Sequence, residues 1–145
     1  MEIVVINGPN INMLGIREPD IYGSTTYDQL WRMLHDHAAE RGIELDIYQS
    51  NHEGDLIDRI QAAYGAADGI IINPGAYTHT SIALPDAVKA VGLPTVEVHI
   101  SDPDSREDYR KTDYIREACV KTIAGRGVQG YIDAVRFLAD KESEQ

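Results

Sequence analysis

The sequence predicts an α/β fold in which five parallel strands form one sheet between two layers of helices. Two observations predict it. Short apolar runs, each long enough for one buried strand, alternate with longer segments whose apolar residues recur at helical spacing. Glycine, proline or asparagine lies near most of the transitions between these segments, where turns are expected. Continuous apolar runs are typical of parallel strands, because helices cover both faces of such a sheet.

The expected strands are short and apolar. The first precedes a long polar loop, and the third is a continuous apolar run that Asn73-Pro74-Gly75 terminates. The five expected strands cover residues 2–6, 43–49, 69–72, 95–99 and 119–124.

The expected helices connect these strands. Thr26 is suited to cap the first helix, which ends near Gly42. The later helices cover residues 55–67, 81–91 and 129–139, and the helix over 81–91 is expected despite Pro85. In the first two helices the residues expected to face inward recur every three or four positions: Leu30, Leu34, Ala38, Leu56, Ile60 and Ala63.

Five strand–helix units with short right-handed crossovers most simply give the strand order 2-1-3-4-5, a flavodoxin-like three-layer sandwich. A chain of 145 residues with 43% hydrophobic content fits one core. We therefore expect a single domain over residues 1–145, in which only residues 141–145 form a frayed tail.

The charge balance limits the possible partners. Against 24 Asp and Glu there are only 13 Lys and Arg, a net charge of -11 that repels nucleic acids and anionic membranes. A small anionic substrate therefore needs a local cluster of arginines, for which Arg17, Arg106 and Arg110 are candidates. No opening segment resembles a secretory leader, and no apolar run reaches the roughly 20 residues that cross a bilayer, so we expect a cytoplasmic protein.

The single cysteine, Cys119, excludes an internal disulfide. It lies within an apolar run, so we interpret it as a small core side chain rather than a nucleophile.

Residues 7–23 form the most informative segment. They follow the first strand, at the edge where open α/β sheets bind their ligands. Two prolines and three glycines prevent a regular element, while two exposable asparagines, an arginine and a tyrosine supply polar groups. A connection this long in a small domain is typical of a lid over a site.

Glu97 and His99 form a second candidate. Alternation along a strand places both on one face, where the carboxylate could hold an imidazole nitrogen and favour the protonated ring. A held imidazolium is a general acid; the alternative is a structural ion pair at a strand end. Because the pair lies at a carboxyl strand end near Asn73 and the lid, we favour the catalytic interpretation.

Residues 73–81 form a third polar segment. The Asn-Pro-Gly turn and the following Thr-His-Thr-Ser run could cap a helix and present backbone N–H groups to a carboxylate. His79 could be a capping or surface residue instead, and we expect the other histidines, His35, His37 and His52, to be inert. His79, His99 and Glu97 could converge, but they lack recognisable ligand spacing, so we expect no metal site.

Residues 125–130 read Gly-Arg-Gly-Val-Gln-Gly, which satisfies the dinucleotide motif G-x-G-x-x-G. That motif needs a following strand that ends in an acidic residue, and the remaining residues predict one helix instead. We therefore interpret these glycines as serving a tight turn and helix-on-sheet packing.

Four separated segments, residues 7–23, 73–81, 97–101 and 106–110, together resemble the type II 3-dehydroquinate dehydratases of the shikimate pathway, and the resemblance runs from Glu2 to about Ala139. It implies the reversible removal of water from 3-dehydroquinate to give 3-dehydroshikimate, by anti elimination through an enolate and without a cofactor.

The resemblance also implies roles for individual residues. Tyr22 matches the base, and because a phenol has a pKa of about 10, a base of this kind needs a nearby cation, which Arg17 matches. His99 matches the proton donor to the departing hydroxyl, and Glu97 matches the residue that orients it. Asn10 matches the residue that holds a water against the enolate oxygen, which stabilises the developing charge.

Further matches concern substrate binding. The substrate carboxylate site corresponds to Asn73 with the backbone of Ile100 and Ser101, and contacts to ring hydroxyls correspond to His79 and Arg110. Asp86 matches a contact that a neighbouring subunit supplies, which requires an oligomer; family members are typically dodecamers of four trimers. Arg106 resembles a second lid arginine.

Two other classes of protein are kept as alternatives. One is a flavodoxin-like nucleotide- or phosphate-binding module. A receiver domain, however, needs an aspartate at the end of the third strand, where this chain has Asn73, and a flavin carrier needs a hydroxyl-rich loop after the first strand, where it has Asn7-Gly8-Pro9-Asn10. The other is a purely structural subunit, which an enzyme assay would distinguish.

Overall fold

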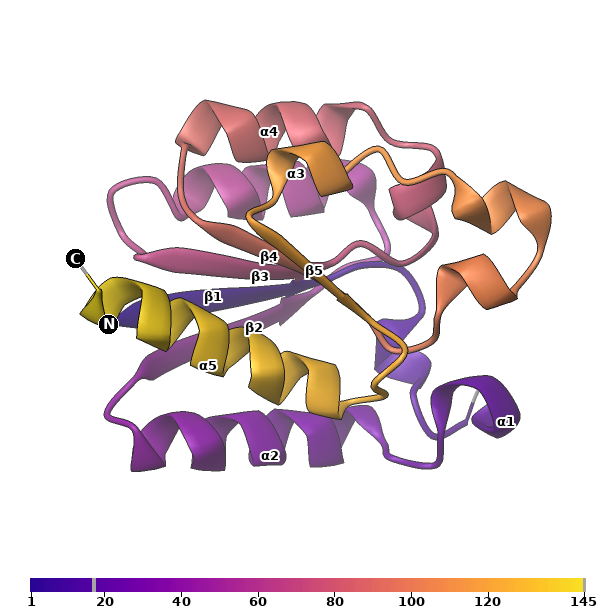
Figure 1. The fold of residues 1–145 in the computed structure, drawn as a ribbon, viewed down its shortest axis with the longest axis horizontal. Helices are drawn as coiled ribbons and strands as arrows, with labels where there is room; N and C mark the ends of the chain where they lie inside the picture. Colours follow the sequence, from indigo (N-terminus) through magenta and orange to yellow (C-terminus); the bar gives the residue numbers. More distant parts are fainter. Residues whose placement is uncertain (17, 145) are drawn as a thin grey trace.

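A five-stranded parallel sheet forms the centre of the computed structural model, which describes residues 1–16 and 18–144 (Figure 1). Its strand order is β2-β1-β3-β4-β5, which confirms the predicted topology. The strands are β1 (Glu2–Asn7), β2 (Glu44–Gln49), β3 (Gly69–Asn73), β4 (Thr95–His99) and β5 (Lys121–Ala124). They lie within two residues of their predicted bounds.

Helices cover both faces of the sheet, as predicted. In Figure 1, α3 (Glu53–Ala62) and α4 (Ala83–Val91) lie above the sheet, and α2 (Tyr27–Glu40) and α5 (Gln129–Ser143) lie below it. The side chains of β1 alternate between two separate cores. Ile3 and Val5 pack in the core that includes α2 and α5, whereas Val4 and Ile6 pack in the core that includes α3 and α4.

Helix α2 begins where the sequence predicts. The Thr26 hydroxyl accepts a hydrogen bond from Gln29 N (3.1 Å), and the Gln29 side chain accepts one from Thr26 N (2.9 Å), which completes a capping box. All six residues predicted to face inward in α2 and α3 are buried.

Four helix ends differ from the prediction, among them the start of α3, which lies at Glu53 rather than residue 55. Helix α3 ends at Ala62 rather than residue 67, because turns follow and Gly65 adopts a left-handed φ of 73°. Helix α4 begins at Ala83 rather than residue 81, since the Ser81 hydroxyl accepts from Leu84 N (3.1 Å) before the first turn. Helix α5 continues to Ser143, so most of the predicted frayed tail is helical.

The motif at residues 125–130 serves packing, as predicted. A Cβ at Gly130 would lie 3.3 Å from Val98 Cγ1 and 3.4 Å from Ile123 Cγ2, so glycine lets α5 approach the sheet closely. Cys119 is half-buried against the core that includes α3 and α4, and burial raises the pKa of its thiol, which agrees with the predicted core role.

The irregular segments gather beyond the carboxyl ends of the strands, on the right in Figure 1. They contain the short helices η1 (Ile11–Met13), α1 (Pro19–Tyr22), η2 (Gly75–His79), η3 (Pro103–Ser105) and η4 (Asp108–Lys111). A further short helix, η5 (Arg116–Ala118), lies directly before β5 and contacts α4. None of the helices that the structure describes is long and apolar enough to cross a membrane.

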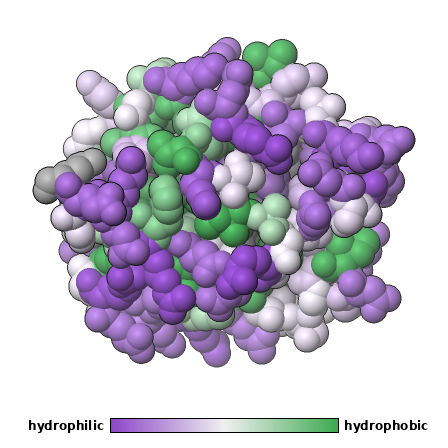
Figure 2. All heavy atoms as spheres, in the orientation of Figure 1, coloured by the Kyte–Doolittle hydropathy of each residue, from purple (hydrophilic) through white to green (hydrophobic). Residues whose placement is uncertain are grey.

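The surface has an uneven distribution of hydropathy. Figure 2 shows hydrophilic residues over much of this face and hydrophobic residues gathered near its middle, where the edge strand β5 runs in Figure 1. Val120, directly before β5, is 48% exposed.

Candidate active site

Two loops meet in direct backbone contact at the carboxyl edge of the sheet. The ends of β1 and β3 lie in register, and Gly8 N donates to the Asn73 carbonyl (2.7 Å). A Cβ at Gly8 would lie 2.3 Å from the Pro74 carbonyl oxygen, and one at Gly75 would lie 2.9 Å from the Pro9 carbonyl oxygen. Only glycine fits at these two positions, so the residue type fixes how closely the two loops approach.

A buried hydrogen-bond network fixes Asn73. The Tyr131 hydroxyl accepts from Asn73 Nδ2 (2.9 Å) and donates to Asn7 Oδ1 (2.7 Å), while Asn73 Oδ1 accepts from Gly75 N (3.1 Å). Tyr131 is fully buried, and this burial raises the pKa of its phenol, which therefore remains neutral. We did not predict this role for Tyr131; the available signal was a tyrosine, rather than phenylalanine, on the apolar face of a helix.

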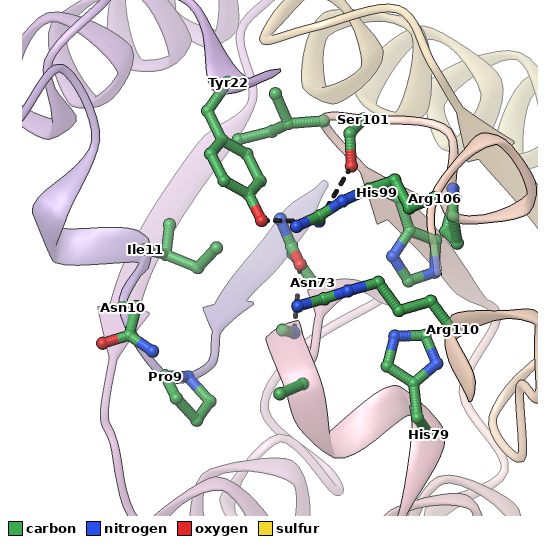
Figure 3. Close-up of a pocket in the computed structure, with 14 residues that line it drawn as sticks. Pro9, Asn10, Ile11, Tyr22, Asn73, His79, His99, Ser101, Arg106 and Arg110 are labelled. Atoms are coloured by element: carbon green, nitrogen blue, oxygen red, sulfur yellow. Dashed lines mark hydrogen bonds between the residues drawn. The ribbon is translucent and has the colours of Figure 1, made fainter. Parts of the chain in front are cut away.

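A pocket opens above these loops (Figure 3). It brings together nine of the residues that the sequence analysis singled out, from four separate segments of the chain. They are Asn10, Tyr22, Asn73, His79, His99, Ile100, Ser101, Arg106 and Arg110. Glu97 lies behind His99, Asp86 is exposed on α4 outside the pocket lining, and Arg17 lies outside the described residues.

Tyr22, the last residue of α1, is held by Arg106. Arg106 Nη1 donates to the Tyr22 hydroxyl (2.6 Å), and the guanidinium carbon lies 5.2 Å from the centre of the tyrosine ring. The same nitrogen reaches Ser101 Oγ at 3.5 Å (Figure 3). Arg106 therefore connects the segment after β1 to the segment after β4.

Two further polar side chains line the opposite wall. Arg110, in η4, donates to Glu107, the residue directly before η4 (2.8 Å). This ion pair fixes the guanidinium. His79 Nδ1 lies 2.7 Å from the Thr112 carbonyl oxygen, so Nδ1 carries the proton. Asn10 has a left-handed φ of 70°, and its backbone N donates to Asn51 Oδ1 (3.1 Å), which fixes the loop at the pocket entrance.

The segment after β4 is fixed by the loop that follows β5. Gly127 N donates to the Ile100 carbonyl (3.0 Å), and Gly125 N lies 3.3 Å from the Ser101 carbonyl oxygen. Both glycines have positive φ, 76° at Gly125 and 58° at Gly127. The glycine-rich segment thus supports the wall of the pocket from outside.

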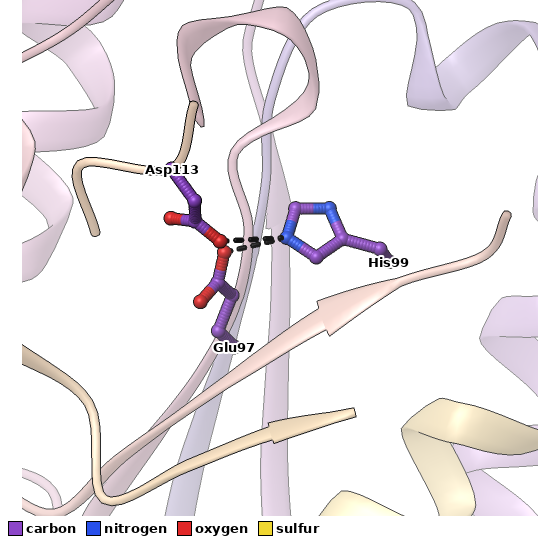
Figure 4. A group of neighbouring side chains, drawn as sticks. All are labelled: Glu97, His99 and Asp113. Atoms are coloured by element: carbon purple, nitrogen blue, oxygen red, sulfur yellow. Dashed lines mark hydrogen bonds and ion pairs between the residues drawn. The ribbon is translucent and has the colours of Figure 1, made fainter. Parts of the chain in front are cut away.

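His99 lies between two carboxylates (Figure 4). Its Nε2 is 2.5 Å from Glu97 Oε2 and 3.7 Å from Asp113 Oδ2. Glu97 is fully buried, and its other oxygen accepts from the Thr122 hydroxyl (3.0 Å). The structure therefore agrees with the predicted Glu97–His99 contact and adds Asp113, which lies in a loop without a recognisable pattern.

The three groups shift one another's protonation. Burial lowers the pKa of His99, but its hydrogen-bonded and charged contacts with Asp113 and Glu97 outweigh burial and raise that pKa to about 9. Burial raises the pKa of Glu97, whereas contacts with His99 and Glu97 outweigh burial and lower the pKa of Asp113. At neutral pH His99 is therefore an imidazolium, the form that donates a proton.

The donor atoms of Glu97, His99 and Asp113 lie within 4.8 Å of one another, which raises the question of a metal ion. Ligands bound tetrahedrally at about 2.0–2.1 Å are separated by roughly 3.3 Å. The 2.5 Å contact between Glu97 and His99 is shorter than this, so the two groups are joined directly by a hydrogen bond. As arranged, the cluster fits a shared proton better than a metal ion.

The histidines that we expected to be inert lie away from the pocket lining. His35 is half-buried with its ring 4.0 Å from that of Trp31, and His52 is exposed. His37 is half-buried on α2, and burial lowers the pKa of its imidazole.

Comparisons with known proteins agree with this geometry. The family model described as Dehydroquinase class II matches residues 1–139. The chain is 51% identical to a 3-dehydroquinate dehydratase from Clostridium acetobutylicum over 99% of this chain and 100% of that protein, and 55% identical to one from Corynebacterium glutamicum over 96% of each. The crystal structure of the type II dehydroquinase from Butyrivibrio crossotus superposes with a TM-score of 0.95 at 48% identity, covering 96% of this chain and 97% of that one.

Proposed function

Because this chain belongs to the class II dehydroquinase family, we propose that its pocket removes water from 3-dehydroquinate to form 3-dehydroshikimate. This dehydration, a step of the shikimate pathway, makes the chain a lyase. The alternative of a flavodoxin-like nucleotide- or phosphate-binding module is not favoured, because the matched family and the named relatives are dehydratases.

The reaction needs a base and an acid. The proton to be removed lies next to a ketone, and the hydroxyl departs from the neighbouring carbon. In our proposal Tyr22 takes the proton and His99 gives a proton to the hydroxyl, which leaves as water. Support comes from the position of both side chains in one pocket and from the raised pKa of His99, about 9, which keeps the acid protonated at neutral pH.

A phenolate base needs a cation close to its oxygen. Arg106 donates to the Tyr22 hydroxyl at 2.6 Å, so a guanidinium lies directly at the oxygen of the proposed base. The family resemblance gives the same task to Arg17, and the proposal keeps both arginines in it. An arginine suits this place, since it stays charged at any pH that the enzyme meets.

Substrate binding and charge stabilisation use the remaining walls. We assign the substrate carboxylate to Asn73 and the backbone of Ile100 and Ser101. The ring hydroxyls are assigned to His79 and Arg110, and a water on the enolate oxygen to Asn10. The hydrogen bonds that fix Asn73, His79 and Arg110 support these roles, because positioned donors stabilise developing charge without reorganisation.

We also propose that the active unit is a homo-oligomer, with a dodecamer of four trimers as the expected form, located in the cytoplasm. Asp86 is exposed and lies outside the pocket of its own chain, as a residue that serves a neighbouring site would. The hydrophobic residues gathered over the edge strand β5 suit a subunit contact (Figure 2).

The direct test is an assay of the purified protein with 3-dehydroquinate, following the enone absorbance of the product. A rise in absorbance that depends on intact Tyr22 and His99 supports the assignment. The observation that carries the proposal is the meeting of these two residues in one pocket of a chain from this family. A folded protein that produces no enone would favour the structural-subunit alternative instead.

A further inference from the structure

Asp113 has one carboxylate oxygen that the mechanism leaves unexplained. Its side chain is 7% exposed, and Oδ2 finds no hydrogen-bond donor among the residues that the structure describes. That oxygen points toward the imidazole of His99, 3.7 Å from Nε2 (Figure 4). Burying a carboxylate oxygen without a hydrogen bond is costly, so its place beside His99 calls for a functional reason.

The backbone fixes the carboxylate. Asp113 Oδ1 accepts from Ile115 N and Arg116 N, both at 3.0 Å, at the start of η5. The next residue, Tyr114, donates its backbone N–H to the Thr78 carbonyl (3.0 Å), which ties this loop to the segment that carries His79. One oxygen is therefore anchored, and the other is presented to His99.

We propose that Asp113 is a positioning residue that works with Glu97 to hold the ring of His99 as an imidazolium with Nε2 turned away from the substrate. The inference rests on the proposed role of His99 as the acid. Nε2 keeps its proton in the hydrogen bond to Glu97, and Nδ1 is left to give its proton to the departing hydroxyl. The negative charge of Asp113 stabilises the protonated ring and so extends proton donation to higher pH.

The surrounding charges are consistent with this role. Glu97 and Asp113 face the ring from β4 and from the loop before η5, and Arg116 Nη2 lies 3.6 Å from Asp113 Oδ2. Tyr22, His79, Arg106 and Arg110 line the pocket side of His99. Two carboxylates, one imidazolium and one guanidinium sum to zero, and the guanidinium is the exposed member, since the Arg116 side chain is 55% exposed.

The two carboxylates differ in how readily they take up a proton. The pKa of Glu97 is raised by burial, while the pKa of Asp113 is lowered, against burial, by His99 and Glu97. Glu97 is therefore the carboxylate that shares a proton with the ring, and Asp113 is the one that stays charged. Glu97 alone would be a weaker support for the imidazolium.

The test is the titration of His99 in Asp113→Asn. Asparagine keeps an oxygen for the two backbone N–H groups but removes the charge. NMR of the histidine ring nitrogens, with the His99 signal assigned by its loss in His99→Gln, should show the pKa of His99 lowered by about one unit or more. The alkaline limb of kcat/KM should move down in parallel, with KM nearly unchanged at pH 7. If the asparagine variant fails to fold, Asp113→Ser, which also removes the charge, is expected to give the same shift in the pKa of His99.

Asp108→Asn is the matched control, because Asp108 is a carboxylate of the same segment whose side chain is 96% exposed. It should leave the titration of His99 unchanged. Arg116→Gln should raise the pKa of His99 slightly, since it removes a competing cation from Asp113. An unshifted His99 in folded Asp113→Asn would overturn the proposal. The NMR titration does not depend on turnover, so failure of the proposed reaction would be seen separately, in the 3-dehydroquinate assay.

Discussion

Single side chains in the pocket are held by hydrogen bonds to second residues, two of which, Glu97 and Tyr131, do not line the pocket. Arg106 holds Tyr22, Glu97 holds His99, and Tyr131 holds Asn73. Each of these hydrogen bonds is 2.9 Å or shorter. The proposed chemistry at the sheet edge therefore also depends on Glu97 and Tyr131, which lie behind the pocket lining.

Replacing Tyr22 by phenylalanine should remove the base without removing the binding site. We expect kcat to fall by about 10²–10⁴-fold, the usual contribution of a general base, with a much smaller change in substrate affinity. Steady-state assays and isothermal titration with the product measure the two effects separately. The control is Tyr109→Phe, because Tyr109 is 65% exposed on the neighbouring segment. Retained turnover in Tyr22→Phe would show that another group removes the proton.

Tyr131→Phe should weaken both the fold and substrate binding. It leaves Asn7 Oδ1 and Asn73 Nδ2 buried without their shared partner, which costs about 1–3 kcal/mol of unfolding free energy. Because Asn73 then loses its anchor, KM should rise more than kcat falls. Chemical denaturation and steady-state kinetics measure these effects. A variant with unchanged stability and KM would mean that Gly75 N alone fixes Asn73.

Two residues that support others, Asp113 and Tyr131, were missed by sequence reasoning, whereas Glu97 and Arg106 were predicted. Nine pocket residues were predicted because they match family motifs or follow apolar strands. Asp113 and Tyr131 were missed because their partners lie 14 and 58 positions away in the chain, at His99 and Asn73. No local pattern encodes such a contact, which exists only once the sheet brings the segments together.

At the scale of elements, two loops form the base of the site by direct backbone contact. Gly8→Ala should separate them, because its Cβ would lie 2.3 Å from the Pro74 carbonyl oxygen and backbone atoms cannot rotate away. We expect a loss of about 1–3 kcal/mol in unfolding free energy and at least a tenfold fall in kcat/KM.

The matched control is Gly54→Ala. A Cβ there meets nothing within 4 Å, and the residue lies in the first turn of α3. Alanine should stabilise the helix by about 0.5–1 kcal/mol and leave kinetics unchanged. Equal effects of the two substitutions would contradict the importance of the loop contact.

The elements themselves were largely predictable. Apolar runs and the capping residue Thr26 placed the strands and the start of α2 correctly, and β4 matches its predicted bounds. The helix ends were less predictable, because Gly65 and the Ser81 hydroxyl act through backbone geometry that periodicity does not report. Helix α5 continues past its predicted end, since Ala139, Lys141 and Glu142 are good helix formers.

At the scale of the whole molecule, a net charge of -11 surrounds a pocket that we propose takes an anionic substrate. The local arginines, Arg106 and Arg110, offset this charge only at the pocket itself. The hydrophobic residues gathered near β5 offer the proposed oligomer a contact area apart from the hydrophilic surface around them (Figure 2).

An active site that is shared between two subunits predicts that two defective variants regain activity when their subunits mix. Asp86→Ala should lower activity at least about tenfold, because it removes a charged contact from the neighbouring site. Tyr22→Phe removes the proposed base from its own site. In a mixed oligomer, a chain with intact Tyr22 beside a chain with intact Asp86 forms a complete site. Random mixing of equal amounts should therefore restore about a quarter of the sites.

The experiment refolds the two variants together and compares the activity with that of each variant refolded alone. The matched control mixes Tyr22→Phe with His99→Ala, whose defects fall in the same pocket of one chain, so every site keeps a defect and no activity returns. Light scattering on the same samples gives the size of the oligomer. If the Asp86→Ala mixture gains nothing over its separate components while forming oligomers, Asp86 acts within its own chain or not at all, and the shared site is wrong even though the subunits associate.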